Sequence, residues 1–189
     1  VRLEGVNVLW PLLAFGHFER TRALQEEAKG EARQAVLAIA ASARAAYERS
    51  RVEVLIPETE EEPSRYETRA RLCGSSTSVP AEVPRQTHYA PVDAPGRDYR
   101  TGDATEGWQC LGFDAPDRQR FRLSDRQGGS YRTKARGGPD PGPRGFEATA
   151  EGDIDGDGIT SLFSVTGHID PKTGELRIHP GVFTDRENE

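Results

Sequence analysis

The chain has 189 residues, of which 34% are hydrophobic and 7% aromatic, and its formal net charge is −6. This length predicts one domain with a modest core. The acidic balance disfavours nucleic acid as the main partner, because phosphate binding needs a basic face.

Residues 1–20 form a short apolar N-terminal segment, interrupted by Asn7 and Pro11. The apolar run between residues 6 and 15 is much shorter than the ~20 residues that a membrane-spanning helix needs. It also lacks the basic start and small-residue cleavage site of a secretory signal. Three interpretations remain open: an amphipathic anchor, the remnant of a longer hydrophobic segment, or a strand or turn that covers the globule.

Residues 21–51 predict a long helix at the start of a globular domain that covers residues 21–189. The segment is rich in alanine and straight-chain residues, with one glycine and no proline. Apolar residues recur at helical spacing and form one narrow stripe: Val36, Ile39, Ala40, Ala43 and Tyr47. Such a stripe can pack against a flat surface, which we expect to be a sheet.

Residues 57–106 are expected to form a long irregular loop, because they contain six prolines and few apolar clusters. The chain has two cysteines, Cys73 and Cys110, which admit a single internal pairing. In a reducing cytosol they would stay thiols, whereas in an exported protein their bond would clip this loop.

Residues 107–183 predict an antiparallel sheet, because short segments with strand character follow one another with turns and no helix between them. These segments are GWQCLGF at 107–113, the alternating stretch around Phe121 and Leu123, FEATAEGD, SLFSVTG and GELRIH. One long helix followed by such a sheet is an α+β fold, with the helix stripe lying on the sheet.

Asp153, Asp155 and Asp157 occupy alternate positions of the turn DIDGDG. Carboxylates at this spacing, followed by glycine, place hard oxygen ligands on one side of a tight loop, as in the first half of a helix-loop-helix calcium site. Calcium is the predicted ion, and Ile159 at the seventh position would add a backbone carbonyl. The alternative is an Asp/Gly hairpin turn without metal, since these residues favour turns unaided.

The calcium pattern is incomplete, because Ser164 stands at the twelfth position, where a bidentate glutamate is expected. Glu151, Asp170 or water could supply the missing ligand.

Catalytic motifs are not found: the four histidines occur singly, without a HExxH or a Cys/His metal spacing. We therefore expect no catalytic residues and a protein that is not an enzyme.

Four segments resemble, in order and spacing, the globular part of type IV pilin-like proteins of myxobacteria and related Gram-negative bacteria. They are LCGSSTSVPAEVPRQTHY, TGDATEGWQCLGF, FEATAEGDIDGDGITSLFSVTG and GELRIHPGVFTDRENE. The most specific parts are GWQCL around Trp108 and AEGDIDGDG. The resemblance implies a long N-terminal helix half embedded in the subunit, an antiparallel sheet packed on it and a variable loop between them. It also supports the Cys73–Cys110 disulfide.

The function that the resemblance implies is a structural subunit of a type IV pilus or a type II secretion pseudopilus. Its partners would be other pilin subunits, contacted through the N-terminal helix. Its location would be extracytoplasmic: in the periplasm, anchored to the inner membrane, or in a cell-surface filament.

The chain departs from that family at its start. The mature family chain begins with an aromatic residue or methionine, carries a glutamate at its fifth position and continues as an uninterrupted apolar helix. Here the chain has Val1, Glu4, Gly5 and Pro11, so contact with the inner membrane depends on an upstream apolar segment. The alternative function is a free-standing extracytoplasmic binding module, stabilised by calcium and derived from a pilin that no longer assembles.

Overall fold

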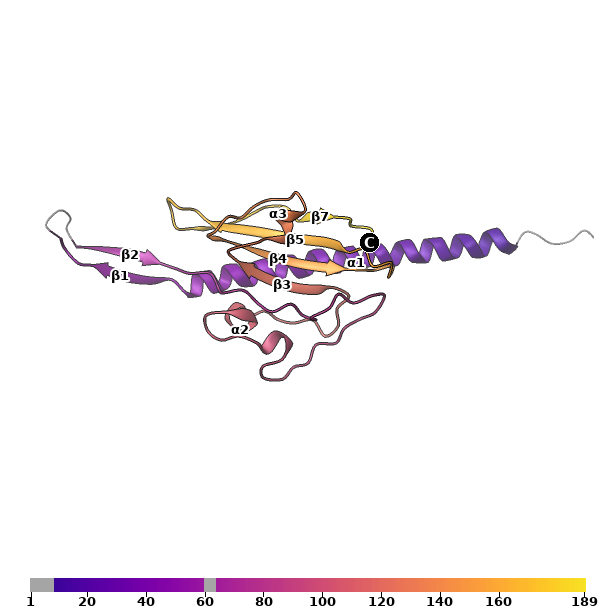
Figure 1. The fold of residues 1–189 in the computed structure, drawn as a ribbon, viewed down its shortest axis with the longest axis horizontal. Helices are drawn as coiled ribbons and strands as arrows, with labels where there is room; N and C mark the ends of the chain where they lie inside the picture. Colours follow the sequence, from indigo (N-terminus) through magenta and orange to yellow (C-terminus); the bar gives the residue numbers. More distant parts are fainter. Residues whose placement is uncertain (1–8, 60–63) are drawn as a thin grey trace, which may run out of the picture.

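The computed structural model describes residues 9–59 and 64–189, and of residues 9–21 only the helical backbone. The elements in chain order are α1 Leu9–Arg49, β1 Val52–Ile56, β2 Arg65–Arg69, a 3-10 turn Asp98–Arg100, α2 Gly107–Leu111, β3 Arg122–Gln127, α3 Arg132–Ala135, β4 Gly145–Gly152, β5 Ser161–Ile169, β6 Leu176–Ile178 and β7 Phe183–Asp185. A long helix with antiparallel sheets makes an α+β fold, as predicted (Figure 1).

Helix α1 starts earlier than the sequence predicted, at Leu9 rather than residue 21. Pro11 lies in the first turn, where backbone N–H groups have no partner within the helix, so a proline there removes no hydrogen bond. Of the predicted N-terminal segment, residues 1–8 lie outside the described residues, and residues 9–20 belong to α1. The interpretation of residues 9–20 as a strand or turn is therefore wrong.

The larger sheet has the strand order β3-β4-β5-β6, with β7 also paired to β5. All of its pairs are antiparallel, and β6 and β7 follow one another along the same edge of β5. Register places Ala150 of β4 between Leu123 of β3 and Phe163 of β5. Because side chains alternate across a strand, one face of the sheet is apolar. It carries the buried residues Leu123, Phe146, Ala148, Ala150, Phe163 and Val165.

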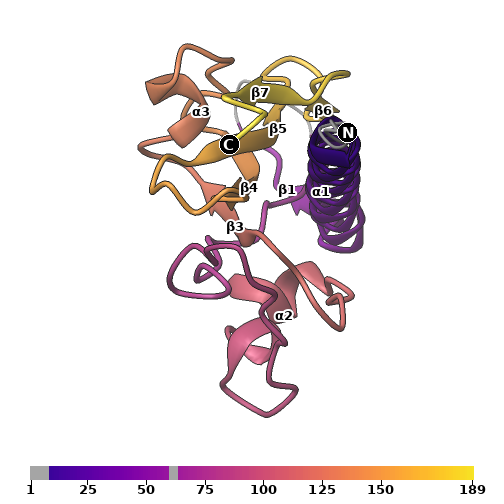
Figure 2. The ribbon, with the colours of Figure 1, turned by 90° about the vertical axis from the view of Figure 1, so that its right-hand side faces the viewer.

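That apolar face packs on α1, which runs along it (Figure 2). The predicted helix stripe is confirmed and extended, because every member is buried: Ala28, Ala32, Val36, Ile39, Ala40, Ala43, Ala46 and Tyr47. Most of these residues are alanines, whose small side chains let the helix backbone approach the sheet closely. Near the C-terminal end of the stripe, the Tyr47 hydroxyl donates a 2.6 Å hydrogen bond to the carbonyl of Gly174.

In the part that the structure describes, the segment predicted as a long irregular loop contains only two short regular elements, β2 and the 3-10 turn. Its irregular remainder is held by polar side chains. The indole of Trp108 donates to the carbonyl of Thr77 at 2.8 Å, and the buried Gln119 amide donates to the carbonyls of Val79 and Phe121. These side chains satisfy backbone oxygens in a segment that has little regular structure of its own.

The segment around Trp108 was predicted as a strand and is instead helix α2. Trp108 and Leu111, three positions apart, are both buried, which is the spacing of one helix face. An apolar run this short does not distinguish helix from strand by itself. Packing decided the outcome: Trp108 lies 4.7 Å from Tyr99 and 5.2 Å from Phe113 between ring centroids.

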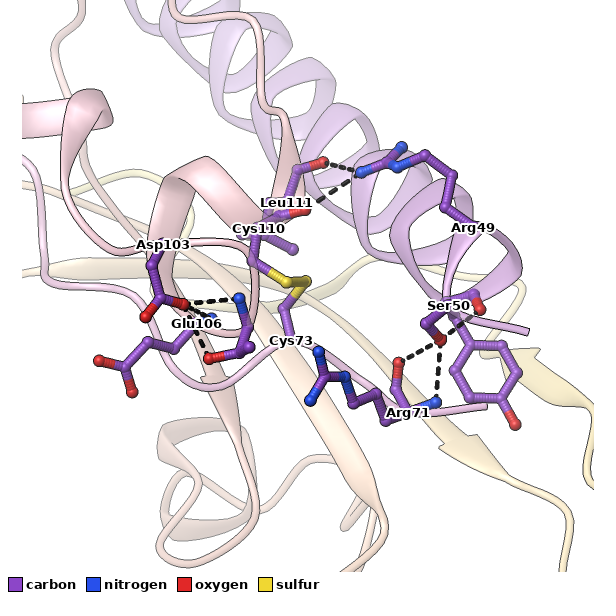
Figure 3. The surroundings of a disulfide bond; sticks show 10 residues. Arg49, Ser50, Arg71, Cys73, Asp103, Glu106, Cys110 and Leu111 are labelled. Atoms are coloured by element: carbon purple, nitrogen blue, oxygen red, sulfur yellow. Dashed lines mark hydrogen bonds between the residues drawn. A yellow bond between two sulfur atoms is a disulfide. The ribbon is translucent and has the colours of Figure 1, made fainter. Parts of the chain in front are cut away.

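Cys73 and Cys110 form a disulfide, with their Cα atoms 5.8 Å apart (Figure 3). The bond joins the segment that follows the β1–β2 hairpin to helix α2. Disulfides persist where the surroundings are not reducing, so the bond indicates a non-reducing setting.

The C-terminal end of α1 is tied to this disulfide region (Figure 3). The Arg49 guanidinium donates to the carbonyls of Cys110 at 3.1 Å and Leu111 at 3.2 Å. The Ser50 hydroxyl donates to the carbonyl of Arg71 at 3.0 Å and accepts its N–H at 2.9 Å. The helix end, α2 and the chain leaving the hairpin therefore form one connected unit.

Substitutions on the two faces of α1 should differ sharply in their effect on stability. Ile39 is fully buried against the sheet and Leu37 is 51% exposed. We expect Ile39→Ala to lower the free energy of unfolding by about 2–4 kcal/mol, because it leaves a cavity. The control Leu37→Ala should change it by less than about 0.5 kcal/mol. Chemical denaturation of both variants tests this, and equal losses would contradict the packing of α1 on the sheet.

Candidate metal centre

The turn with Asp153, Asp155 and Asp157, called the aspartate loop, joins β4 to β5 at the end of the β4–β5 hairpin. Its first carboxylate, Asp153, is buried and organises the loop. One Asp153 oxygen accepts the N–H of Gly156 at 2.8 Å, and the other accepts the N–H of Gly158 at 3.1 Å. Both glycines have positive φ, +80° and +91°, which explains their place in the sequence.

The other two carboxylates are exposed and each accepts one backbone N–H. Asp155 accepts from Asp157 at 3.2 Å, and Asp157 accepts from Ile159 at 2.7 Å. One carboxylate oxygen from each aspartate lies within 4.8 Å of the others. The sequence prediction that these three carboxylates converge is therefore confirmed.

The donor set fits a hard divalent cation. Calcium binds oxygen at about 2.3–2.6 Å, so two ligands on opposite sides of one ion lie roughly 5 Å apart. Magnesium also takes carboxylate oxygens, at about 2.1 Å, so three carboxylates alone do not choose between the two ions. What a bound ion would supply here is charge neutralisation and cross-linking of the loop, through Asp153, Asp155 and Asp157.

The remaining ligands proposed from sequence lie elsewhere or stay untested. Ile159 follows the cluster with an exposed side chain, and its carbonyl as a ligand stays a prediction. Ser164 is buried inside β5, where its hydroxyl oxygen lies 2.7 Å from that of Thr133. Glu151 accepts hydrogen bonds from Arg122 of β3 and Arg132 of α3, and Asp170 lies beyond the other end of β5, so neither completes the site.

Two residues that sequence reasoning missed contact the loop. Arg85 lies 3.7 Å from a carboxylate oxygen of Asp153, but its side chain is largely exposed. The backbone N–H of Gln86 donates to the carbonyl of Asp153 at 3.2 Å, and its side-chain amide donates to the carbonyl of Asp155. A Cβ at Gly156 would lie 2.9 Å from the Gln86 amide carbon, so a larger residue there would displace the Gln86 side chain.

The electrostatics of the loop favour a cation. Three carboxylates lie together, and Arg85 at 3.7 Å is the cation that the described structure pairs with them. Like charges at this separation repel, and a divalent cation removes that cost. The turn nevertheless has a complete set of internal N–H donors, so it can also hold its shape as an Asp/Gly turn.

Comparisons with protein-family models, with curated protein sequences and with solved structures find no match for this chain. Membership of the pilin-like family therefore stays a prediction. Within residues 9–59 and 64–189, no helix is both long and apolar enough to span a membrane.

The face of the sheet that points away from α1 carries buried carboxylates that are well satisfied. Glu147 of β4 accepts the backbone N–H groups of Arg132 and Thr133, at 2.8 and 2.6 Å, and the Thr133 hydroxyl at 2.6 Å. Glu151 pairs with the side chains of Arg122 and Arg132. These contacts hold α3 against the sheet, so both carboxylates have a structural role.

Among the buried carboxylates Asp125 is the exception, and no sequence pattern indicated it. It lies in β3 opposite Ala148, on the face that packs toward α1, and it is fully buried. Its Oδ1 atom is the one buried side-chain N or O atom of the described chain that has no hydrogen-bond partner. Burial, and then the charge of Glu147, raise the pKa of Asp125 to about 8, from an ordinary value near 3.8.

Loss of one loop carboxylate should destabilise the protein only when the ion is present. We expect Asp155→Ala to lower the melting temperature by several degrees in millimolar calcium and to have little effect in excess chelator. The matched control is Asp170→Ala, since Asp170 forms a similar turn by accepting N–H groups at 2.8 and 3.3 Å without neighbouring ligands. Thermal unfolding of both variants with and without calcium tests this. An equal loss of melting temperature for Asp155→Ala in calcium and in chelator would show that the aspartate loop is an Asp/Gly turn without metal.

The raised pKa of Asp125 predicts a pH-dependent stability. Between about pH 4 and pH 8 the folded protein holds a proton that the unfolded chain has released, so stability should fall as pH rises through this window. Asp125→Asn stays neutral, and we expect it to be more stable than the parent at about pH 8, with the gap closing toward pH 5. Melting curves of both proteins across this range test this, and parallel pH profiles would contradict it.

Proposed function

We propose that this chain is a pilin-like structural subunit of an extracytoplasmic filament, either a type IV pilus or a type II secretion pseudopilus. The observation that carries the proposal is the half-embedded helix. Helix α1 has 41 residues, which corresponds to about 60 Å. Among residues 22–49, whose side chains the structure describes, the buried positions begin at Ala28, and the earlier turns of the helix extend past the sheet (Figure 1).

A helix of this kind serves two purposes in one element. Its later turns supply the apolar surface that the sheet needs, and its earlier turns stay available to other subunits. Leu24, at the point where α1 leaves the globule, is 55% exposed although it is a large apolar residue. The proposed partners are other copies of this chain or related pilin subunits, packed through the extended part of α1.

The disulfide is in keeping with a location outside the cytoplasm, which for this function means the periplasm, the inner membrane surface or a cell-surface filament. The aspartate loop lies close to where α1 leaves the globule, because Leu24, Arg120 and Asp153 line the same groove. Calcium bound there would stiffen the globule next to the proposed subunit contact.

The second candidate is a free-standing calcium-stabilised binding module that has kept the globule and lost assembly. The converging carboxylates of the aspartate loop favour it, because they provide stability that does not depend on neighbouring subunits. Both candidates are non-catalytic, and they differ in whether the extended part of α1 has a partner.

Shearing of cells that produce the chain natively distinguishes them. Filaments collected by ultracentrifugation should contain the chain, detected by an antibody to the globule and by immunogold labelling. We expect Leu24→Arg to reduce the amount in filaments several-fold without changing the melting temperature of the globule. The control Val92→Arg, at another exposed apolar position, should leave it unchanged. A chain that occurs only as a soluble extracytoplasmic protein would contradict the filament function and favour the binding module.

A further inference from the structure

The β1–β2 hairpin stands apart from the rest of the fold. Its two strands form a separate two-stranded sheet, and β1 pairs with no other strand of the described chain. The hairpin extends past the C-terminal end of α1 and away from the larger sheet (Figure 1). A two-stranded ribbon is marginally stable in water by itself, and three or more strands are normally needed.

The hairpin also exposes an unusual amount of apolar surface. Val52 is 56% exposed, Leu55 is 52% exposed and Tyr66 is 72% exposed. Register places Leu55 opposite Tyr66, so both lie on one face, and Val52 lies on the other. Apolar side chains on both faces of an isolated ribbon indicate a contact that the single chain does not supply.

The two strands differ in a way that identifies which edge makes that contact. Strand β1, VEVLI, carries Val52, Val54 and Ile56 on one face and Leu55 beside Glu53 on the other, so it is the more apolar of the two strands. Strand β2, RYETR, carries Arg65, Glu67 and Arg69 on one face, and charges of this kind protect the outer edge of a sheet. The hairpin therefore has the composition of one half of a four-stranded sheet, with β1 inside.

We propose that the free edge of β1 pairs antiparallel with β1 of a second copy of this chain, giving the strand order β2-β1-β1-β2. Pairing centred on Val54 places Val52 opposite Ile56 of the second copy and Glu53 opposite its Leu55. No like charges then face one another, and aliphatic side chains meet across the new interface. The contact is symmetric, so it closes as a dimer and leaves only the charged β2 edges open.

The other pairings are less favourable. If β2 paired with itself around Glu67, Glu67 would face its own copy and Arg65 would face Arg69, which places like charges opposite one another. If β1 paired with β2 of the second copy, an apolar β1 edge would stay open however many copies joined. Self-pairing of β1 removes both apolar edges at once.

This contact uses a different element from the filament contact proposed above. The hairpin lies at the C-terminal end of α1, whereas the filament contact uses its N-terminal turns (Figure 1). The dimer can link two copies that do not share a filament contact, including copies in neighbouring filaments. Its test therefore succeeds or fails independently of the proposed function.

The test compares two lysine substitutions that are matched within the hairpin. Val54 faces Glu67, and Thr68 faces Glu53. Each of Val54→Lys and Thr68→Lys therefore places a lysine opposite a glutamate of the same hairpin, which preserves the ribbon. Only Val54→Lys brings two lysines face to face in the β1–β1 dimer.

Sedimentation velocity of the purified chain over a range of concentrations gives the dimer dissociation constant. We expect a monomer–dimer equilibrium for the parent chain and for Thr68→Lys, and dimerisation weakened about tenfold or more by Val54→Lys. The double variant Val54→Glu/Glu67→Lys should also be monomeric alone and should dimerise when mixed with Val54→Lys. A monomeric parent chain, or a dimer that Val54→Lys does not weaken, would overturn the proposal.

Discussion

The contact between α1 and the apolar face of the larger sheet is the constraint on which the rest of the structure depends. Alanines along the helix stripe let the backbone approach β4 and β5, while Val36 and Ile39 fill the space between them. The same contact fixes where each end of the helix lies. One end is tied through Tyr47 and Arg49 to Gly174 and the disulfide region, and the other leaves the globule near the aspartate loop.

The opposite face of the sheet shows how a chain with few apolar residues still fills a domain. Glu147 and Glu151 are buried there, and backbone N–H groups, a hydroxyl and arginines satisfy them. Removing any one partner would leave a buried carboxylate without compensation for its charge. These polar contacts therefore depend on α3 remaining against the sheet. On the face toward α1, one oxygen of Asp125 lacks such a partner, and burial raises the pKa of this carboxyl.

The features with functional meaning lie at the two ends of α1. The aspartate loop and the extended helical turns occupy one end, and the disulfide region and the β1–β2 hairpin occupy the other (Figure 1). Different surfaces at the two ends of one long element agree with the proposed role in assembly.

The sequence by itself determined the features that depend on neighbours along the chain. These are the helix stripe around Val36 and Ile39, the alternating strands after Phe121, and the three aspartates of one turn. Tertiary structure decided the features that depend on distant partners. Packing against Tyr99 and Phe113 made the Trp108 segment a helix, Arg85 and Gln86 joined the aspartate loop from far away in the chain, and β2 formed because β1 offered it an edge. Local periodicity can be recognised from the spacing of residues along the chain. The long-range contacts instead depend on packing between segments that come together only when the chain folds.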